Sequence, residues 1–296
     1  MHDLVIIGGG PAGYTAGIYA GRYLLDAVVI AEKKSGTLMD APLVENFPGF
    51  PSMRGFELGK KIESHLSEYD VPIKREKAVS ARKEGDAFIV KTDKGEHSAK
   101  ALILATGWKR RKLPVEGVDK LEHKGVSYCA TCDAPLFADK VVAVIGGGDA
   151  GVGAAIMISE YASKVYIVEV MDELAAEPIK QERIKNNEKI EVFTGTQVEK
   201  VIGDSWIERI VLSSGKELDV QGMFIEIGGF PRVQLARDLG VGLDERDNIV
   251  IDAASCTNVE GVFAAGDVTN VPFKQAVVAS GQGASAAWSA YRFLKV

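Results

Sequence analysis

The sequence has little cysteine and little histidine. Three cysteines and four histidines occur among 296 residues, and three cysteines are too few for a disulfide framework. A zinc site needs four ligands, and the histidines are scattered, so we expect no metal. Any cysteine chemistry must therefore be local. The candidates are the closely spaced Cys129 and Cys132, because Cys256 has no other cysteine near it in the sequence.

Basic charge is also scarce. Lys and Arg total 35 against 41 Asp and Glu, which gives a net charge of −6. Binding to nucleic acid requires a clustered basic face, and only Lys109–Lys112 forms a basic run. We therefore expect no nucleic-acid partner.

No long hydrophobic run is present. The nearest approach to a membrane span, residues 141–158, contains Asp149 and five glycines, so it is typical of a buried strand that turns into a helix. The first residues, MHDLVIIGGG, contain no basic region or cleavage site of an export signal. We therefore expect no membrane partner and a cytoplasmic protein.

What the sequence does contain is a repeat. Segments 3–22 and 140–159 each have an apolar β-branched run, a glycine cluster and then small residues at helical spacing. In both, the glycines form G-x-G-x-x-G between a predicted strand and a predicted helix. This pattern allows a tight turn, close approach of a pyrophosphate and close helix packing. The glycines are Gly8, Gly10 and Gly13 in the first copy and Gly146, Gly148 and Gly151 in the second.

An acidic residue completes each copy. Glu32 follows Gly13 by 19 residues and Glu169 follows Gly151 by 18, each at the end of a second apolar run. Such an acid accepts hydrogen bonds from ribose hydroxyls. Two nucleotide units in one chain indicate hydride transfer between a pyridine nucleotide and a flavin.

Strand patterns elsewhere support an α/β fold. Together with the length, they predict two doubly wound, three-layer domains of the Rossmann type. The patterns lie at 87–92, 101–105, 207–212, 223–227 and 261–267.

Six motifs carry a family resemblance. In their order they resemble the low-molecular-weight thioredoxin reductases, and the run VPFKQAVVASGQGASAA is similar to the reductase portion of the alkyl hydroperoxide reductase flavoprotein. The motifs are GGGPAG at 8–13, VENFPGF at 44–50, ILATG at 103–107, CATCD at 129–133, GGGDAG at 146–151 and GVFAAGDV at 261–268.

The resemblance implies an architecture and a cofactor. It implies a homodimer in which residues 1–111 and 234–296 form a domain that binds FAD, with a nucleotide-type domain of residues 112–233 inserted into it. Further FAD-site residues then follow from the motifs. These are Pro11 and Ala12 with the first glycines, Glu45 and Asn46 in a flavin-side loop, Thr106 and Gly107 in a turn, Gly266 and Asp267 at the ribityl chain, and Lys274, Gln275 and Ala276 along the pyrimidine edge.

The redox centre implied by the resemblance is the C-x-x-C pair. Cys132 would receive electrons from reduced FAD, and Cys129 would attack the disulfide of thioredoxin or a thioredoxin-like protein. Asp133 would be the general acid that protonates the leaving thiolate. We also expect the pair to precede a helix whose dipole stabilises a thiolate.

The second nucleotide unit departs from the family. The NADPH-dependent enzymes carry a basic cluster where this chain has Glu169, Val170, Met171 and Ala175, and Gly153 replaces a usual acid. NADPH is therefore disfavoured, since its phosphate needs charge-assisted pairs.

Several alternatives stay open. The chain resembles a subgroup that receives electrons from ferredoxin or a deazaflavin, whereas Glu169 is the residue expected for NADH. A flavin-binding redox sensor without turnover, and a component of a hydroperoxide reductase, are further hypotheses.

Overall fold

The computed structural model describes residues 1–295, and these form two compact units. Both chain ends belong to the first unit, and the second lies between them in sequence. The sequence predicts boundaries after 111 and 233, whereas those of the structure fall after 109 and 229. No sequence pattern indicates that a short segment, 40–43, belongs to the second unit. The first unit comprises 1–39, 44–109 and the chain from 230 onward, and the second comprises 40–43 and 110–229.

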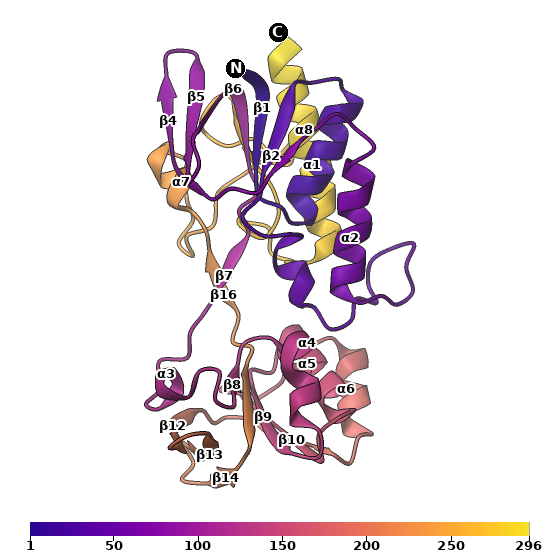
Figure 1. The fold of residues 1–296 in the computed structure, drawn as a ribbon, viewed down its shortest axis with the longest axis vertical. Coiled ribbons are helices and arrows are strands. Elements are labelled where there is room, and N and C mark those ends of the chain that lie inside the picture. Colours follow the sequence, from indigo (N-terminus) through magenta and orange to yellow (C-terminus); the bar gives the residue numbers. More distant parts are fainter. Residues whose placement is uncertain (296) are drawn as a thin grey trace. The chain divides into compact units, whose positions relative to one another are not determined.

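A seven-stranded sheet organises the first unit (Figure 1). Its order is β3-β2-β1-β6-β5-β4, and β17 pairs with β6; all neighbours are parallel except in the β4–β5–β6 meander. The strands are β1 (His2–Ile7), β2 (Ala27–Ile30), β3 (Ile73–Lys74), β4 (Ala78–Glu84), β5 (Ala87–Thr92), β6 (Glu96–Leu104) and β17 (Val262–Ala264), and the helices are α1 (Pro11–Arg22), α2 (Gly55–Leu66), α7 (Gln234–Asp238) and α8 (Ala276–Lys295).

Both faces of this sheet are buried, as the continuous apolar run of β1 predicts. Leu4 and Ile6 lie in the core shared with α1 and α8, whereas Val5 and Ile7 lie in the core on the opposite face. Helices α1, α2 and α8 stand together on the first of these faces (Figure 1). A sheet with two covered faces is the predicted three-layer arrangement.

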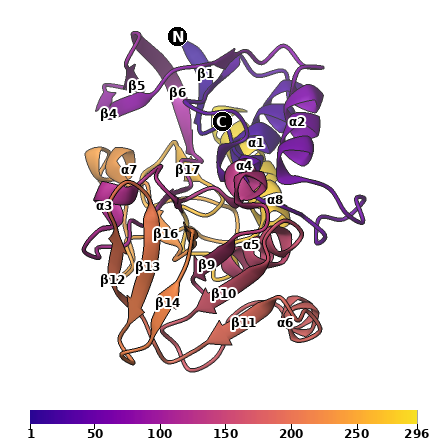
Figure 2. The ribbon, with the colours of Figure 1, turned by 60° about the horizontal axis from the view of Figure 1, so that its bottom comes forward.

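The second unit repeats the plan. Its parallel sheet has the order β11-β10-β9-β15-β8, and a separate antiparallel sheet, β12-β13-β14, packs with it (Figure 2). Short β7 (Trp108–Arg110) pairs with β16 (Gly229–Pro231). The remaining elements are α3 (Val118–Leu121), β8 (Val126–Ser127), α4 (Ala130–Asp133), η2 (Ala134–Phe137), β9 (Val141–Ile145), α5 (Asp149–Ser159), β10 (Lys164–Val168), α6 (Pro178–Lys185), β11 (Ile190–Phe193), β12 (Val198–Gly203), β13 (Ile207–Leu212), β14 (Glu217–Asp219) and β15 (Gly222–Ile225).

The two glycine clusters have matching geometry. Gly8 has φ +132° and Gly146 has φ +116°, backbone conformations that residues with a side chain rarely adopt. A Cβ atom on Gly13 would lie 1.9 Å from the carbonyl oxygen of Gly8, and Gly151 stands in the same relation to Gly146. Each cluster therefore joins its strand to its helix as predicted, and the predicted α/β fold with two Rossmann-like units is confirmed.

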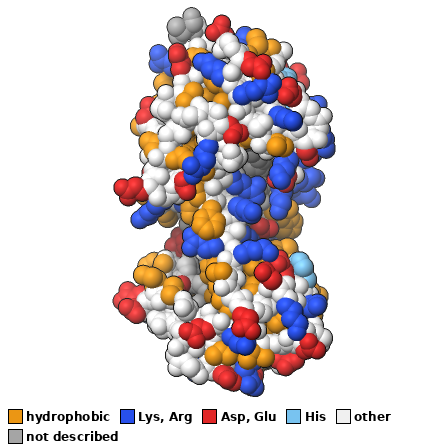
Figure 3. All heavy atoms as spheres, turned by 90° about the vertical axis from the view of Figure 1, so that its left-hand side faces the viewer, with side chains coloured by type: hydrophobic (Ala, Val, Ile, Leu, Met, Phe, Trp, Pro, Cys, Tyr) orange, Lys and Arg blue, Asp and Glu red, His pale blue; other side chains and the backbone are white. Residues whose placement is uncertain are grey.

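The surface carries charges of both signs. Acidic and basic side chains are intermixed on the face shown in Figure 3. Within residues 1–295 every helix is too short or too polar to cross a lipid bilayer.

Candidate functional site

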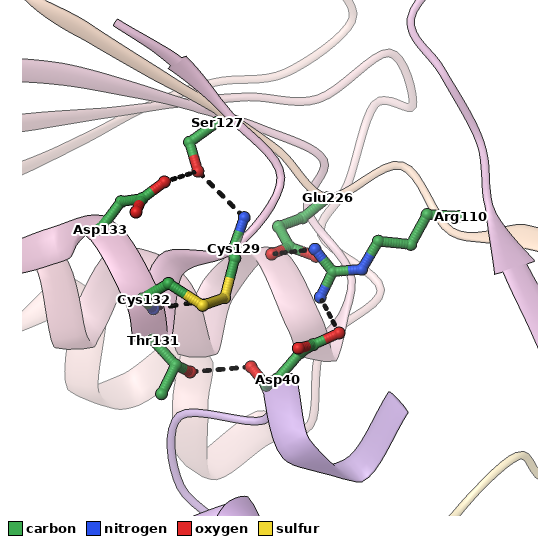
Figure 4. The surroundings of a disulfide bond; sticks show 8 residues. All are labelled: Asp40, Arg110, Ser127, Cys129, Thr131, Cys132, Asp133 and Glu226. Atoms are coloured by element: carbon green, nitrogen blue, oxygen red, sulfur yellow. Dashed lines mark hydrogen bonds and ion pairs between the residues drawn. A yellow bond between two sulfur atoms is a disulfide. The ribbon is translucent and has the colours of Figure 1, made fainter. Parts of the chain in front are cut away.

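The C-x-x-C pair forms a disulfide in the second unit (Figure 4). The Cα atoms of Cys129 and Cys132 are 5.3 Å apart. Cys129 caps helix α4, because its Sγ accepts a hydrogen bond from the backbone N–H of Cys132 at 3.2 Å. Cys132 is exposed and Cys129 is half-buried. The predicted local pairing of these two cysteines is confirmed.

The helix that follows the pair is shorter than expected. Helix α4 contains four residues, Ala130–Asp133, and continues as a 3-10 turn. So short a helix has a small dipole, since the dipole sums over aligned peptide groups. Thiolate stabilisation must therefore come from nearby polar groups.

A hydroxyl group links Asp133 to the disulfide turn. Ser127, the last residue of β8, is buried, and its hydroxyl donates to Oδ2 of Asp133 at 2.6 Å. The same hydroxyl oxygen accepts the backbone N–H of Cys129 at 3.0 Å. The predicted general acid is thus connected with the predicted nucleophile through Ser127, a residue that no sequence motif singles out.

A second polar chain reaches the turn from segment 40–43. The hydroxyl of Thr131, between the two cysteines, donates to the backbone oxygen of Asp40 at 2.8 Å. The Asp40 carboxylate lies 3.2 Å from the Arg110 guanidinium. Arg110 belongs to the basic run noted in the sequence, and here it forms an internal ion pair (Figure 4).

Glu226 is the buried acid of this cluster. It follows β15, and its side chain is 12% exposed with its carboxylate 3.9 Å from Arg110. Burial raises the pKa of Glu226 from 4.5 to about 7; the Arg110 charge opposes this rise, and the Asp40 charge adds to it. No sequence signal points to this role, because Glu226 stands at an ordinary strand end.

The raised pKa predicts a pH dependence of stability. Between pH 4.5 and 7 the folded state holds a proton on Glu226 that the unfolded state has released. The contribution of Glu226 to the free energy of unfolding therefore falls as pH rises through this window. Glu226→Gln should therefore leave stability near pH 4.5 unchanged and increase the free energy of unfolding by up to roughly 3 kcal/mol above pH 7. Urea unfolding at both pH values measures this difference.

Glu116→Gln provides the matched control. The Glu116 side chain is 75% exposed and pairs with Lys200, so its removal should change stability equally little at both pH values. A Glu226→Gln protein no more stable than wild type at high pH would contradict the buried, ionised carboxylate.

The first glycine loop fits the pyrophosphate of FAD. A Cβ atom on Gly10 would meet no atom within 4 Å, so space lies open before the backbone. Gly10 precedes α1 without a side-chain cap, and Pro11 occupies the first turn. The early N–H groups of α1 thus lack a capping side chain, as a phosphate site requires. Ala12 and Gly13 are buried in the same turn.

Asp267 supplies the most specific observation on the cofactor. Burial raises the pKa of this carboxyl, and the Lys274 charge opposes the rise. The Lys274 ammonium itself donates to the backbone oxygens of Asp267, at 2.9 Å, and Thr269. Lys274 therefore braces the loop that carries Asp267. A carboxyl group buried in this way needs hydrogen-bond partners, and the hydroxyl groups of a ribityl chain would supply them.

Other predicted FAD residues are held by hydrogen bonds. The amide of Asn46, beside Glu45, donates to the Gln275 side chain at 3.1 Å, and both Glu45 and Asn46 are exposed. The Thr106 hydroxyl donates to the backbone oxygen of Arg232 at 2.7 Å. The backbone N–H of Arg232 donates to the oxygen of Gly107 at 2.9 Å, and that of Gly266 donates to Gln282 Oε1 at 2.8 Å. The Arg232 guanidinium forms an ion pair with Glu32 at 3.5 Å, and Ala276 begins α8.

Asp267→Asn should have opposite effects on affinity and on stability. Loss of a charged acceptor should raise the FAD dissociation constant about tenfold or more. Because the wild-type pKa is raised, removing the charge should also stabilise the FAD-free protein at neutral pH. Flavin fluorescence and thermal unfolding measure the two effects. Asp204→Asn, at a 95% exposed side chain, should change neither; unchanged FAD affinity in Asp267→Asn would contradict the assigned site.

The acidic residue of the second unit is hydrogen-bonded to its own glycine loop. Glu169 accepts the backbone N–H of Gly147 and, at 2.9 Å, that of Met171. Its carboxylate therefore folds onto the loop. Both Gly146 and Gly151 form the tight turn, and a Cβ on Gly148 would meet no atom within 4 Å.

The chain after β10 packs on the same loop. The backbone N–H groups of Ala175 and Ala176 point to the oxygen of Gly147 at 3.0 and 3.2 Å. A Cβ atom on Gly147 would lie 2.5 Å from the Leu174 side chain. Val170 and Met171 are 60% and 64% exposed. The positions at which the family carries cations are thus filled by exposed apolar side chains.

Metal ligands do not gather in the described part of the chain. Across residues 1–295, His, Cys, Asp and Glu side chains form no cluster of three or more that is suited to a metal ion.

The chain is similar to known flavin-dependent reductases. Residues 2–283 match the family model "Pyridine nucleotide-disulphide oxidoreductase". One component of alkyl hydroperoxide reductase from Pseudomonas aeruginosa is 37% identical over 303 residues; the match covers 99% of this chain but 58% of that protein. The chain thus spans less than two thirds of the length of such relatives.

Solved structures match over nearly the full length. The thioredoxin reductase of T. acidophilum is 37% identical, with a TM-score of 0.94 and coverage of 98% of both chains. A ferredoxin-flavin thioredoxin reductase from Clostridium acetobutylicum is 32% identical, with a TM-score of 0.55 and coverage of 99% of this chain and 98% of that one.

Proposed function

Because this chain belongs to the pyridine nucleotide-disulphide oxidoreductase family, we propose that it passes electrons from ferredoxin, through FAD and the Cys129–Cys132 pair, to a thioredoxin-type disulfide. The family and its thioredoxin reductase relatives make the chain an FAD flavoprotein and a disulfide oxidoreductase. The single observation that carries the substrate proposal is the disulfide itself, hydrogen-bonded through Ser127 to a carboxyl group.

The proposed chemistry is thiol–disulfide exchange. When bound and reduced, FAD would supply the electron pair that opens the Cys129–Cys132 disulfide. One cysteine, Cys129 in our assignment, then attacks the substrate disulfide as a thiolate, and the substrate sulfur that leaves takes a proton from Asp133. Cys132 next attacks the Sγ of Cys129 as a thiolate, so the enzyme disulfide re-forms, and the second substrate sulfur leaves and takes a proton from water. Two electrons and two protons have then reached the substrate.

The donor proposal rests on the missing cations beside the second glycine loop. Glu169, Leu174 and the backbone at 175–176 pack on Gly147, whereas Gly148 is as open as Gly10 of the first loop. Val170, Met171 and Ala175 provide no charge for a phosphate. The similarity to a ferredoxin-flavin thioredoxin reductase supports a one-electron protein donor. A deazaflavin, which gives up two electrons as a hydride, is an alternative small-molecule donor.

NADH is the second candidate donor. Glu169 is the residue expected to accept hydrogen bonds from an unphosphorylated ribose, and the hydroperoxide reductase relatives are similar to nearly all of this chain. Glu169 already accepts the backbone N–H groups of Gly147 and Met171, and its carboxylate has further lone pairs that can accept ribose hydroxyls.

Anaerobic addition of each donor tests the proposal. Reduced ferredoxin should bleach the flavin absorbance rapidly, NADH slowly and NADPH slowest. Rapid bleaching by NADH with no response to ferredoxin would show that NADH is the donor and that the ferredoxin proposal is wrong.

The proposed assembly is a homodimer, supported by the family resemblance and by exposed apolar side chains at Leu24 and Trp288.

A further inference from the structure

Ser127 occupies a distinctive position at the disulfide. It ends the last short strand before the pair and is 7% exposed. Its hydroxyl donates a hydrogen bond to the Asp133 carboxyl group and at the same time accepts one from the backbone N–H of Cys129 (Figure 4). A single buried oxygen thus joins the residues on either side of the redox turn.

These bonds close the turn on itself. The backbone N–H of Asp133 also donates to the carbonyl oxygen of Cys129, at 3.1 Å. The backbone of Asp133 is therefore fixed by the turn, whereas its side chain is fixed by Ser127. Without the hydroxyl, the carboxyl group keeps its place in the chain but loses the bond that orients it.

We propose that Ser127 is a positioning residue that orients the Asp133 carboxyl for proton delivery to the departing substrate sulfur. The inference rests on the proposed function, in which Asp133 is the general acid. Ser127 acts through Asp133 and exchanges no proton with the substrate. Its contribution therefore depends on how much the leaving sulfur needs a proton.

The leaving group provides the test. An alkyl thiolate is a poor leaving group and benefits from a proton donor, whereas an aryl thiolate of low pKa departs without one. Photochemically reduced holoenzyme, mixed anaerobically with hydroxyethyl disulfide or with a nitrobenzoate aryl disulfide, reports both cases without any protein donor or substrate.

Ser127→Ala should slow exchange with the alkyl disulfide about tenfold, the size expected for loss of one hydrogen bond. Exchange with the aryl disulfide should change less than about twofold. Adding Ser127→Ala to Asp133→Asn should cause no further loss, because the orienting bond has nothing left to orient. Ser127→Thr, which keeps the hydroxyl, should restore alkyl exchange.

Ser159→Ala is the matched control. Ser159 is a buried serine of the same unit whose hydroxyl donates to Ile156 O at 2.7 Å, and its loss should affect both disulfides equally. Equal slowing of both by Ser127→Ala, faster alkyl exchange, or additive losses with Asp133→Asn would overturn the inference. If Asp133→Asn itself leaves alkyl exchange unchanged, the general-acid role fails instead. If Ser127→Ala does not fold, the pH profile of Ser127→Thr must match wild type for the inference to stand.

Discussion

Cys132→Ser and Cys129→Ser are each expected to lower disulfide reduction by more than roughly 1,000-fold. Exchange needs one sulfur to attack and a second to resolve the mixed disulfide, so neither serine variant can complete a cycle. Steady-state turnover with a thioredoxin-type protein disulfide measures the loss. Cys256→Ser, at the free cysteine outside the turn, is the control and should keep wild-type turnover.

The two variants should differ in absorption. If Cys132 faces the flavin, Cys129→Ser leaves a thiolate beside oxidised FAD and should show a long-wavelength charge-transfer band, while Cys132→Ser should not. The reverse pattern would exchange the two roles, an order that the greater exposure of Cys132 permits. Retained turnover in either variant would refute the dithiol mechanism.

NADPH is expected to reduce the flavin at least about 100-fold more slowly than reduced ferredoxin, since two or more charge-assisted contacts to its phosphate are missing. Stopped-flow absorbance of the flavin measures both rates. Val170→Arg combined with Met171→Arg separates the causes. Because Gly153 also stands where the NADPH-dependent enzymes carry an acid, we expect NADPH to remain a poor donor after this change.

The control for this variant is Val192→Arg, which adds charge at another half-exposed apolar side chain of the same unit. A gain of roughly 100-fold in the double arginine variant alone would show that only the phosphate site is missing. Rapid reduction by NADPH in the unmodified protein would contradict the donor proposal.

The sequence predicted the fold well because its strongest signals are local. Gly8 and Gly13 must touch across a tight turn, as must Gly146 and Gly151, and only glycine permits that contact. Strands buried on both faces, such as β1, are continuous apolar runs. Backbone geometry and burial can therefore be recognised from the spacing of residues in the sequence.

The polar groups around the disulfide could not be predicted from the sequence in this way. Asp40 joins Thr131 and Arg110 from a segment far away in the chain, and Glu226 arrives from the end of β15. No spacing rule connects these positions. Ser127 was closer to prediction, two residues before Cys129, yet its hydroxyl direction depends on the turn that follows.

The most direct test of the central claim follows electrons from the flavin to a protein disulfide. Holoenzyme is photochemically reduced without oxygen and mixed with a stoichiometric excess of oxidised thioredoxin-type protein, and the new thiols on that protein are counted as the flavin reoxidises. The account predicts about two thiols on the partner for each electron pair that the enzyme holds, and in Cys132→Ser a flavin that stays reduced. Wild-type flavin that stays reduced, or that reoxidises without producing thiols on the partner, would contradict it.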